Sequence, residues 1–253
     1  MLSLKSVRCR PAVAALILAS LPACRVAHMP VPDELLPGAR MPVSGRQGFL
    51  PGRHLRFGPF EARDMDRSWT RGRERSGDDS GRRTAEGRYR QRYSFRLHEG
   101  ERAIWHVRCQ TDVQAATVQP GANQTDLRRV VSLECLLTRP DSAATSWRLA
   151  LDAMGERPPT GQLAGEGRRF LVEGTEALQG SPFTFGRPSG YFIQEGLRAL
   201  ATIEVLGDGV VRLGLGLPLV ERDAIVGAAA ALLLFDDLQH ATDQLASDSQ
   251  APG

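Results

Sequence analysis

Lysine is almost absent from this chain of 253 residues, because Lys5 is its only lysine and every other basic residue is arginine. So complete a bias is typical of a GC-rich genome, although selection for bidentate anion binding would give the same composition. Long hydrophobic runs are absent as well. The apolar stretches at 12–21 and 224–235 fall short of the roughly 20 residues that a transmembrane helix needs. Neither stretch is therefore expected to span a membrane.

The first 24 residues have the parts of an export signal. An apolar segment at 12–21 follows a positively charged start and leads to the small residue Ala23 and then to Cys24. The tetrapeptide Leu21-Pro22-Ala23-Cys24 resembles the lipobox of bacterial lipoproteins, which implies cleavage after residue 23 and lipidation of Cys24. The alternative is an ordinary cleaved signal peptide with an incidental cysteine. The positive charges at the start are Lys5, Arg8 and Arg10.

Removal of residues 1–23 would change the charge of the chain. The full sequence has a formal net charge of +3, and the removed part carries three basic residues and no acid, so the remainder is neutral. We therefore expect no nucleic acid partner. Acylation of Cys24 would anchor the protein to a membrane of the cell envelope. The residue after Cys24 is Arg25 and not an aspartate. This resembles the pattern of lipoproteins sorted to the outer membrane, and it implies the periplasmic face of that membrane in a Gram-negative host.

Composition divides the remaining chain into three parts. Proline and glycine recur through 24–52, which predicts an extended tether, while residues 53–240 are long enough for one β-rich globular domain. Residues 241–253 are predicted to be a disordered tail. Within the domain, 67–92 is polar and rich in arginine, so we expect a long mobile loop there. The alternative is an arginine-rich arm for phosphate groups of lipopolysaccharide or cardiolipin, although acidic residues dilute its positive field.

Alternation of apolar and polar residues predicts two long strands in the middle of the chain. Odd positions are mostly apolar over 105–113 and over 131–137, and turn-forming residues lie between the two segments. Cys109 and Cys135 are equally distant from Ala122, so a symmetric hairpin places them opposite each other, within reach of a disulfide. An exported protein meets an oxidising compartment, which favours that bond. The alternative is two buried free thiols.

Further predicted strands flank this hairpin, and short loops between them imply an antiparallel meander. Residues 224–235 carry no charge and include four consecutive alanines, which predicts a helix buried on all sides. The predicted fold is mainly β, with an antiparallel meander forming a barrel or sandwich around or against one hydrophobic C-terminal helix. The other predicted strands lie within 54–65 and at 93–97, 147–151, 170–173, 191–193, 200–206 and 210–217.

The last third of the chain is similar in arrangement to the tubby C-terminal and LURP-one barrels, in which a hydrophobic C-terminal helix fills the centre. The resemblance is carried by Gly190-Tyr191-Phe192-Ile193, by residues 200–204 and by Asp223-Ala224-Ile225. It implies an architecture only, because no basic motif of the phosphoinositide-binding tubby domains can be matched residue by residue. The competing fold is a two-sheet sandwich with an outer helix.

Candidate catalytic and ligand motifs are few. Ser189 lies in the sequence Gly-Arg-Pro-Ser-Gly, whose spacing differs from that of a nucleophile elbow, so we interpret it as a turn residue. Asp236 and Asp237 are interpreted as solvated charges at a helix end. The five histidines show no spacing typical of metal ligands. We expect no cofactor, no metal and no catalytic site.

These features favour a noncatalytic envelope lipoprotein that acts as a membrane-tethered binding or assembly module. Its expected partners are the membrane, through the lipid anchor, and an envelope protein or an anionic lipid. Two alternatives stay open. A carrier of a lipid or small ligand needs a large apolar cavity. An unrecognised hydrolase needs Ser189 or Asp236 within hydrogen-bond reach of a histidine.

Overall fold

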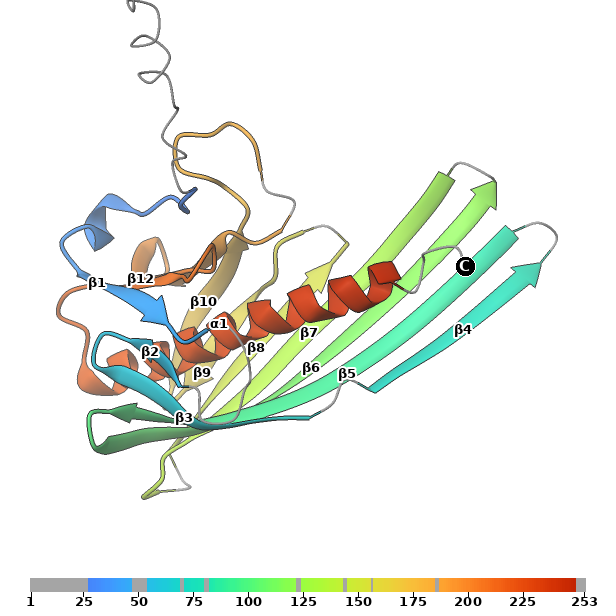
Figure 1. Ribbon diagram of the computed structural model, residues 1–253. Coiled ribbons are helices and arrows are strands. Elements are labelled where there is room, and N and C mark those ends of the chain that lie inside the picture. Colours follow the sequence, from blue (N-terminus) through green and yellow to red (C-terminus); the bar gives the residue numbers. More distant parts are fainter. Residues whose placement is uncertain are drawn as a thin grey trace, which may run out of the picture.

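The computed structural model describes residues 27–46, 54–68, 71–79, 82–121, 124–142, 145–155, 157–184 and 187–248 (Figure 1). Its elements begin with the 3-10 helix η2 (Asp33–Leu35) and end with the α-helix α1 (Leu219–Asp248). Between them lie β1 (Ala39–Ser44), β2 (Leu55–Phe57), β3 (Phe60–Arg67), β4 (Arg71–Asp79), β5 (Arg82–Glu99), β6 (Arg102–Gly121), β7 (Gln124–Thr138), β8 (Ser146–Met154), β9 (Thr160–Gly165), β10 (Arg168–Thr175), β11 (Gly190–Glu195), β12 (Arg198–Glu204) and β13 (Val210–Leu213).

In the described residues, twelve strands close into an antiparallel barrel. The ring runs in the order β3-β2-β1-β13-β12-β11-β10-β9-β8-β7-β6-β5, and β3 completes it by pairing with β5. β4 stands outside the ring, because it pairs with the first half of β5 while β3 pairs with the second half. The strands β4 to β7 therefore extend past the rest of the barrel, at the upper right of Figure 1. The predicted antiparallel meander is confirmed as a barrel.

The central hairpin has the register that its sequence predicts. β6 and β7 place Cys109 opposite Cys135 and Val107 opposite Leu137. These four side chains are buried, so the odd positions of both strands face the interior. Because a shift of one residue would turn every one of them outward, the burial of this face specifies the register.

α1 lies inside the barrel (Figure 1) and fills its centre. Its residues 224–235 are all buried, and the strands cover the helix on all sides, as a helix without a polar face requires. Gly227 lies at a close approach of helix and wall. A Cβ at this position would lie 2.5 Å from Cδ2 of Leu137 and 3.0 Å from Cδ1 of Trp105. Glycine therefore allows the helix to pack directly against β6 and β7.

Polar side chains of the barrel wall hydrogen-bond to the backbone of this helix at two positions along its axis. The indole Nε1 of Trp105 donates a hydrogen bond of 2.7 Å to the carbonyl of Asp223, in the first turns of α1. About two turns further on, the hydroxyl of Tyr93 donates one of 2.8 Å to the carbonyl of Ala231. Both bonds are buried, where a directional contact fixes the helix along its axis as well as in depth.

The prediction of a mobile loop over 67–92 is wrong. This segment contains β4 and the first part of β5, which form a hairpin, and β5 pairs with β6 along almost its whole length. The two ladders of backbone hydrogen bonds satisfy these strands without a continuous apolar face. Periodicity of hydrophobic residues, which was the basis of the sequence prediction, carries no signal for such strands.

Two predicted domain boundaries are also corrected. Of the predicted tether at 24–52, the described part 27–46 belongs to the barrel, because β1 pairs with both β13 and β2 and buries Met41 and Val43. Of the predicted tail at 241–253, residues 241–248 belong to α1, which continues to Asp248. The signal segment 1–23 and residues 24–26, 47–53 and 249–253 lie outside the described residues.

Candidate functional site

Five arginines share one outer face where β4, β5 and β6 meet. The register of β4 and β5 places Arg71 directly opposite Arg90 and Arg73 directly opposite Arg88. Arg92 continues the row on β5, two residues beyond Arg90, and therefore points to the same side. Like charges directly opposite each other destabilise a strand pair, so two such pairs in succession are costly unless an anion offsets them. We refer to these five residues as the arginine face.

The opposite side of these strands explains why the backbone tolerates this arrangement. Tyr89 lies between the two arginine pairs in sequence but points the other way, where it packs against the core. A Cβ on Gly72 or on Gly87 would lie 2.9 Å from the ring of Tyr89. The ring therefore covers both glycines and supplies an apolar contact at this part of β4 and β5.

The acidic contribution to the arginine face comes chiefly from Asp112 on β6. Its Oδ1 accepts a hydrogen bond of 3.0 Å from Arg90 and one of 3.4 Å from Arg88, and its Oδ2 accepts one of 3.0 Å from Gln110. Burial acts to raise the pKa of Asp112, but the hydrogen bonds from Arg90 and Gln110 and the charges of Arg90 and Arg88 hold it below its usual range. Asp112 is thus a fixed negative charge that neutralises one arginine.

The remaining arginines of this face keep their positive charge. Arg71 and Arg73 are exposed and make no ion pair with a described residue, and the side chain of Arg92 donates, among the described residues, only to the neutral amide of Gln110. Glu86 is exposed at the next outward position of β5, opposite Arg75. Among the described side chains, the five guanidinium groups lie near two carboxylates, those of Asp112 and Glu86, and the face keeps a net positive charge.

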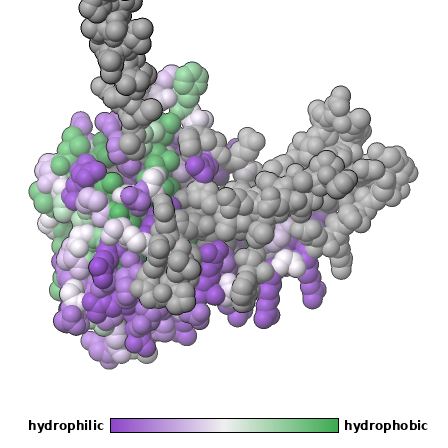
Figure 2. All heavy atoms as spheres, in the orientation of Figure 1, coloured by the Kyte–Doolittle hydropathy of each residue, from purple (hydrophilic) through white to green (hydrophobic). Residues whose placement is uncertain are grey.

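The arginine face borders an open groove of about 820 Å³. Figure 2 shows hydrophilic side chains over the lower face of the molecule, along β3 and onward below β5. The open form of the groove suits a ligand that lies on the surface rather than one that is enclosed. The described residues that line it are Ser68, Gly72 and the five arginines.

The groove lies just beyond one rim of the barrel. β3 ends there, with Arg67 opposite Tyr93 on β5. The arginines of β5 lie on the part of that strand that extends beyond this pair. The described chain enters the barrel at the same end, because Nδ1 of His28 lies 2.8 Å from Oε1 of Glu204, the last residue of β12. The N-terminal side of the protein and the arginine face therefore lie at the same end of the barrel.

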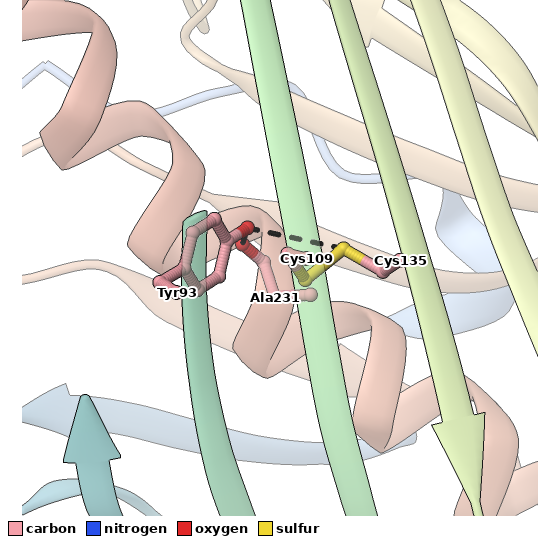
Figure 3. The surroundings of a disulfide bond; sticks show 4 residues. All are labelled: Tyr93, Cys109, Cys135 and Ala231. Carbon is pink, nitrogen blue, oxygen red and sulfur yellow. Dashed lines mark hydrogen bonds between the residues drawn. A yellow bond between two sulfur atoms is a disulfide. The ribbon is translucent and has the colours of Figure 1, made fainter. Parts of the chain in front are cut away.

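The predicted disulfide between Cys109 and Cys135 is confirmed, with the two Cα atoms 4.0 Å apart (Figure 3). Both cysteines are buried in the wall that faces α1, and the hydroxyl of Tyr93 lies 3.9 Å from Sγ of Cys135. Figure 3 shows the bond beside the point where Tyr93 reaches Ala231. The disulfide is thus part of the structure that positions the helix, in a place without direct access to solvent.

At the opposite rim, a charged cluster surrounds the start of α1. The side chain of Asp223 is fully buried and accepts hydrogen bonds from Arg102 (3.1 Å to Oδ2) and Arg222 (3.0 Å to Oδ1), and it forms an ion pair of 3.2 Å with Arg139. Arg102 and Arg222 also bind Glu99. Burial acts to raise the pKa of Glu99, but these hydrogen bonds and charges lower it overall. The contacts of this cluster are internal, which indicates a structural role.

The other residues singled out in the sequence are not brought together. Ser189 is buried, and its Oγ lies 2.7 Å and 3.0 Å from the carbonyl oxygens of Ala177 and Thr175, so it braces the adjacent loop. The side chains of Asp236 and Asp237 and the whole of Cys24 lie outside the described residues. Burial lowers the pKa of His106, and the charges of Arg108 and Arg96 lower it further.

Within the described part of the chain, no group of three or more histidine, cysteine, aspartate or glutamate side chains could hold a metal ion. A helix long and apolar enough to cross a membrane is not found among the same residues.

Sequence reasoning noticed the arginines of 67–92 but missed the face that they form. The signal was present as an alternation of arginine with other residues at 71 and 73 and again at 88, 90 and 92. Only the strand register shows that the two groups lie opposite each other. Comparison with protein-family models, curated proteins and solved structures found no match to this chain. The resemblance to the tubby C-terminal and LURP-one barrels therefore stays a prediction.

Proposed function

We propose that this protein is a noncatalytic, membrane-anchored binding module of the cell envelope. The observation that carries the proposal is the position of α1, whose residues 224–235 occupy the barrel centre, so that binding takes place on outer surfaces. A ligand carrier would instead need that interior space. The engagement of the Ser189 hydroxyl with two carbonyl oxygens supports a noncatalytic role.

The anchor in this proposal is a lipid on Cys24. Cys24 lies only four positions before His28, and a fully extended chain of that length spans at most about 14 Å. The lipid would therefore hold the barrel close to the membrane, with the rim that carries His28 and the arginine face turned toward it. In a Gram-negative host we place the protein on the periplasmic face of the outer membrane.

Two cysteine variants test the anchor. Cells expressing the full chain with Cys24→Ala should lose incorporated palmitate and release the protein from membranes during a carbonate wash. The matched control Cys9→Ala changes the other N-terminal cysteine and should leave both properties as they are. Retention of the Cys24→Ala protein on washed membranes would refute the proposed anchor.

A further inference from the structure

We propose that the arginine face binds the phosphate groups of an anionic lipid surface, and that lipids carrying two phosphate groups bind it best. This inference names a partner for the binding module described above and rests on that proposed function. It is carried by the two arginine pairs, Arg71 with Arg90 and Arg73 with Arg88, and by the net positive charge that they leave exposed.

The spacing of the pairs suits two phosphates. Opposed residues of antiparallel strands have Cα atoms about 5 Å apart, and positions two residues along a strand are about 7 Å apart. Arg90 and Arg88 already contact Asp112, so a phosphate at each pair would be held chiefly by Arg71 or Arg73. Successive pairs can therefore hold two phosphates of the same molecule. Guanidinium groups bind phosphate oxygens through two parallel hydrogen bonds, which lysine does not offer.

The arginine face differs from the other opposed arginine pairs of the barrel. Arg63 and Arg96 also lie opposite each other, but Arg63 binds Glu61 and Arg96 binds Asp64. Among the described residues, acidic partners of that kind are missing at Arg71 and Arg73. The position is also distinctive, because the arginine face lies past the rim at which the described chain enters.

A single opposed pair on β1 and β13 provides a matched control. Arg40 lies directly opposite Arg212, at the outer surface and away from the groove. The double variants R71Q/R73Q and R40Q/R212Q each remove two positive charges from outer strand positions. They differ in whether the groove is affected.

The test measures cosedimentation of the full chain carrying Cys24→Ala, which has no acyl group, with lipid vesicles. The vesicles contain phosphatidylcholine alone, phosphatidylcholine with cardiolipin, or phosphatidylcholine with phosphatidylglycerol at the same total charge. We expect binding in the order cardiolipin, phosphatidylglycerol, phosphatidylcholine. R71Q/R73Q should weaken binding to cardiolipin vesicles about 30-fold and R40Q/R212Q by no more than about threefold, because each arginine near an anionic surface contributes about a fivefold factor.

Two further measurements distinguish a loss of binding from a loss of folding and identify the source of the phosphate. Thermal unfolding of R71Q/R73Q should occur at the same or a higher temperature than that of the parent chain, because two repulsive pairs are relieved. Soluble pyrophosphate should compete with the vesicles only weakly. Strong pyrophosphate binding without vesicle binding would place the ligand in solution and overturn the lipid assignment.

Absence of vesicle binding, or an equal loss in both double variants, would also overturn the proposal. Because the tested chain has no acyl group, these outcomes leave the role of Cys24 as an anchor intact. The anchor fails only in the separate fractionation experiment.

Discussion

Cys109 and Cys135 lie directly opposite each other on β6 and β7 and are joined by a disulfide. The bond closes a loop with a sequence separation of 26 residues. A crosslink of this length should stabilise the folded protein by about 3.5 kcal/mol through the entropy of the unfolded chain. The double variant Cys109→Ser/Cys135→Ser should therefore have a free energy of unfolding lower by about this amount, as measured by urea denaturation.

Thiol labelling provides the control for that prediction. The mature protein, denatured without a reductant, should show no reactive thiol from these two cysteines, and two should appear after reduction. Two reactive thiols before reduction would contradict the disulfide.

We predict that Asp223, at the start of α1, contributes strongly to the free energy of unfolding. Replacing it by alanine would leave Arg102, Arg139 and Arg222 beside a buried site without their shared carboxylate. Breaking a buried ion pair in this way costs about 3 to 5 kcal/mol of folding free energy. Asp152→Ala, at an exposed position of β8, is the control and should change the free energy of unfolding by less than about 0.5 kcal/mol. Similar losses in the two variants would show that the cluster has no special role.

The stability of the protein should fall in acid, in part through Glu99. The folded state holds the pKa of Glu99 below its ordinary value, so the folded protein binds fewer protons than the unfolded chain. The contribution is fully present above the unfolded pKa of about 4.3 and is lost as the pH falls through the lower folded pKa. Glu99→Gln should flatten this part of the curve of melting temperature against pH.

Glu101, two residues after Glu99, gives a control for the loss of stability in acid. Glu101 is exposed and forms no ion pair with another described residue. Glu101→Gln should leave the acid slope as it is in the parent protein. If Glu99→Gln leaves the slope unchanged as well, the ion pairs of Glu99 do not contribute to stability.

Gly227 is predicted to be the position at which helix and wall cannot accept a larger residue. Gly227→Ala would bring the new methyl group too close to Leu137 and Trp105 and should destabilise the fold by about 1 to 3 kcal/mol. Leu137→Ala removes one of these contacts. The double variant Gly227→Ala/Leu137→Ala should then cost less than the sum of the two single variants, as a double-mutant cycle would measure. Strict additivity would show that the two residues do not collide.

The central part of the fold could be predicted because burial leaves a pattern in the sequence. The odd-numbered apolar residues on both sides of Ala122 set the register of β6 and β7, and the uncharged stretch after Asp223 marked the buried helix. Strands without this pattern were missed. β9 has one fully buried apolar side chain, that of Leu163, and β1 contains Pro42, which is unusual in a strand.

The reason that Pro42 is tolerated emerges only from the sheet. β1 pairs with β13 through 39–42 and with β2 only through Val43 and Ser44, so Pro42 lies where the strand changes its partner. The arginine face depends in the same way on pairing between strands. Arg71 and Arg90 are 19 positions apart in the sequence, and nothing local predicts that they lie opposite each other.

The most direct test of lipid binding by the arginine face is photo-crosslinking in intact cells. A photoreactive amino acid at Ser68, which lines the groove, should capture phospholipid, as detected by mass spectrometry of the purified protein. The same amino acid at Glu195, an exposed residue at the end of β11 on the opposite side of the ring from β5, should capture none. Capture at Ser68 should also disappear in the R71Q/R73Q background. Capture of a protein in place of lipid at Ser68, or equal lipid capture at both positions, would contradict a membrane-anchored barrel that binds lipid phosphates through its arginine face.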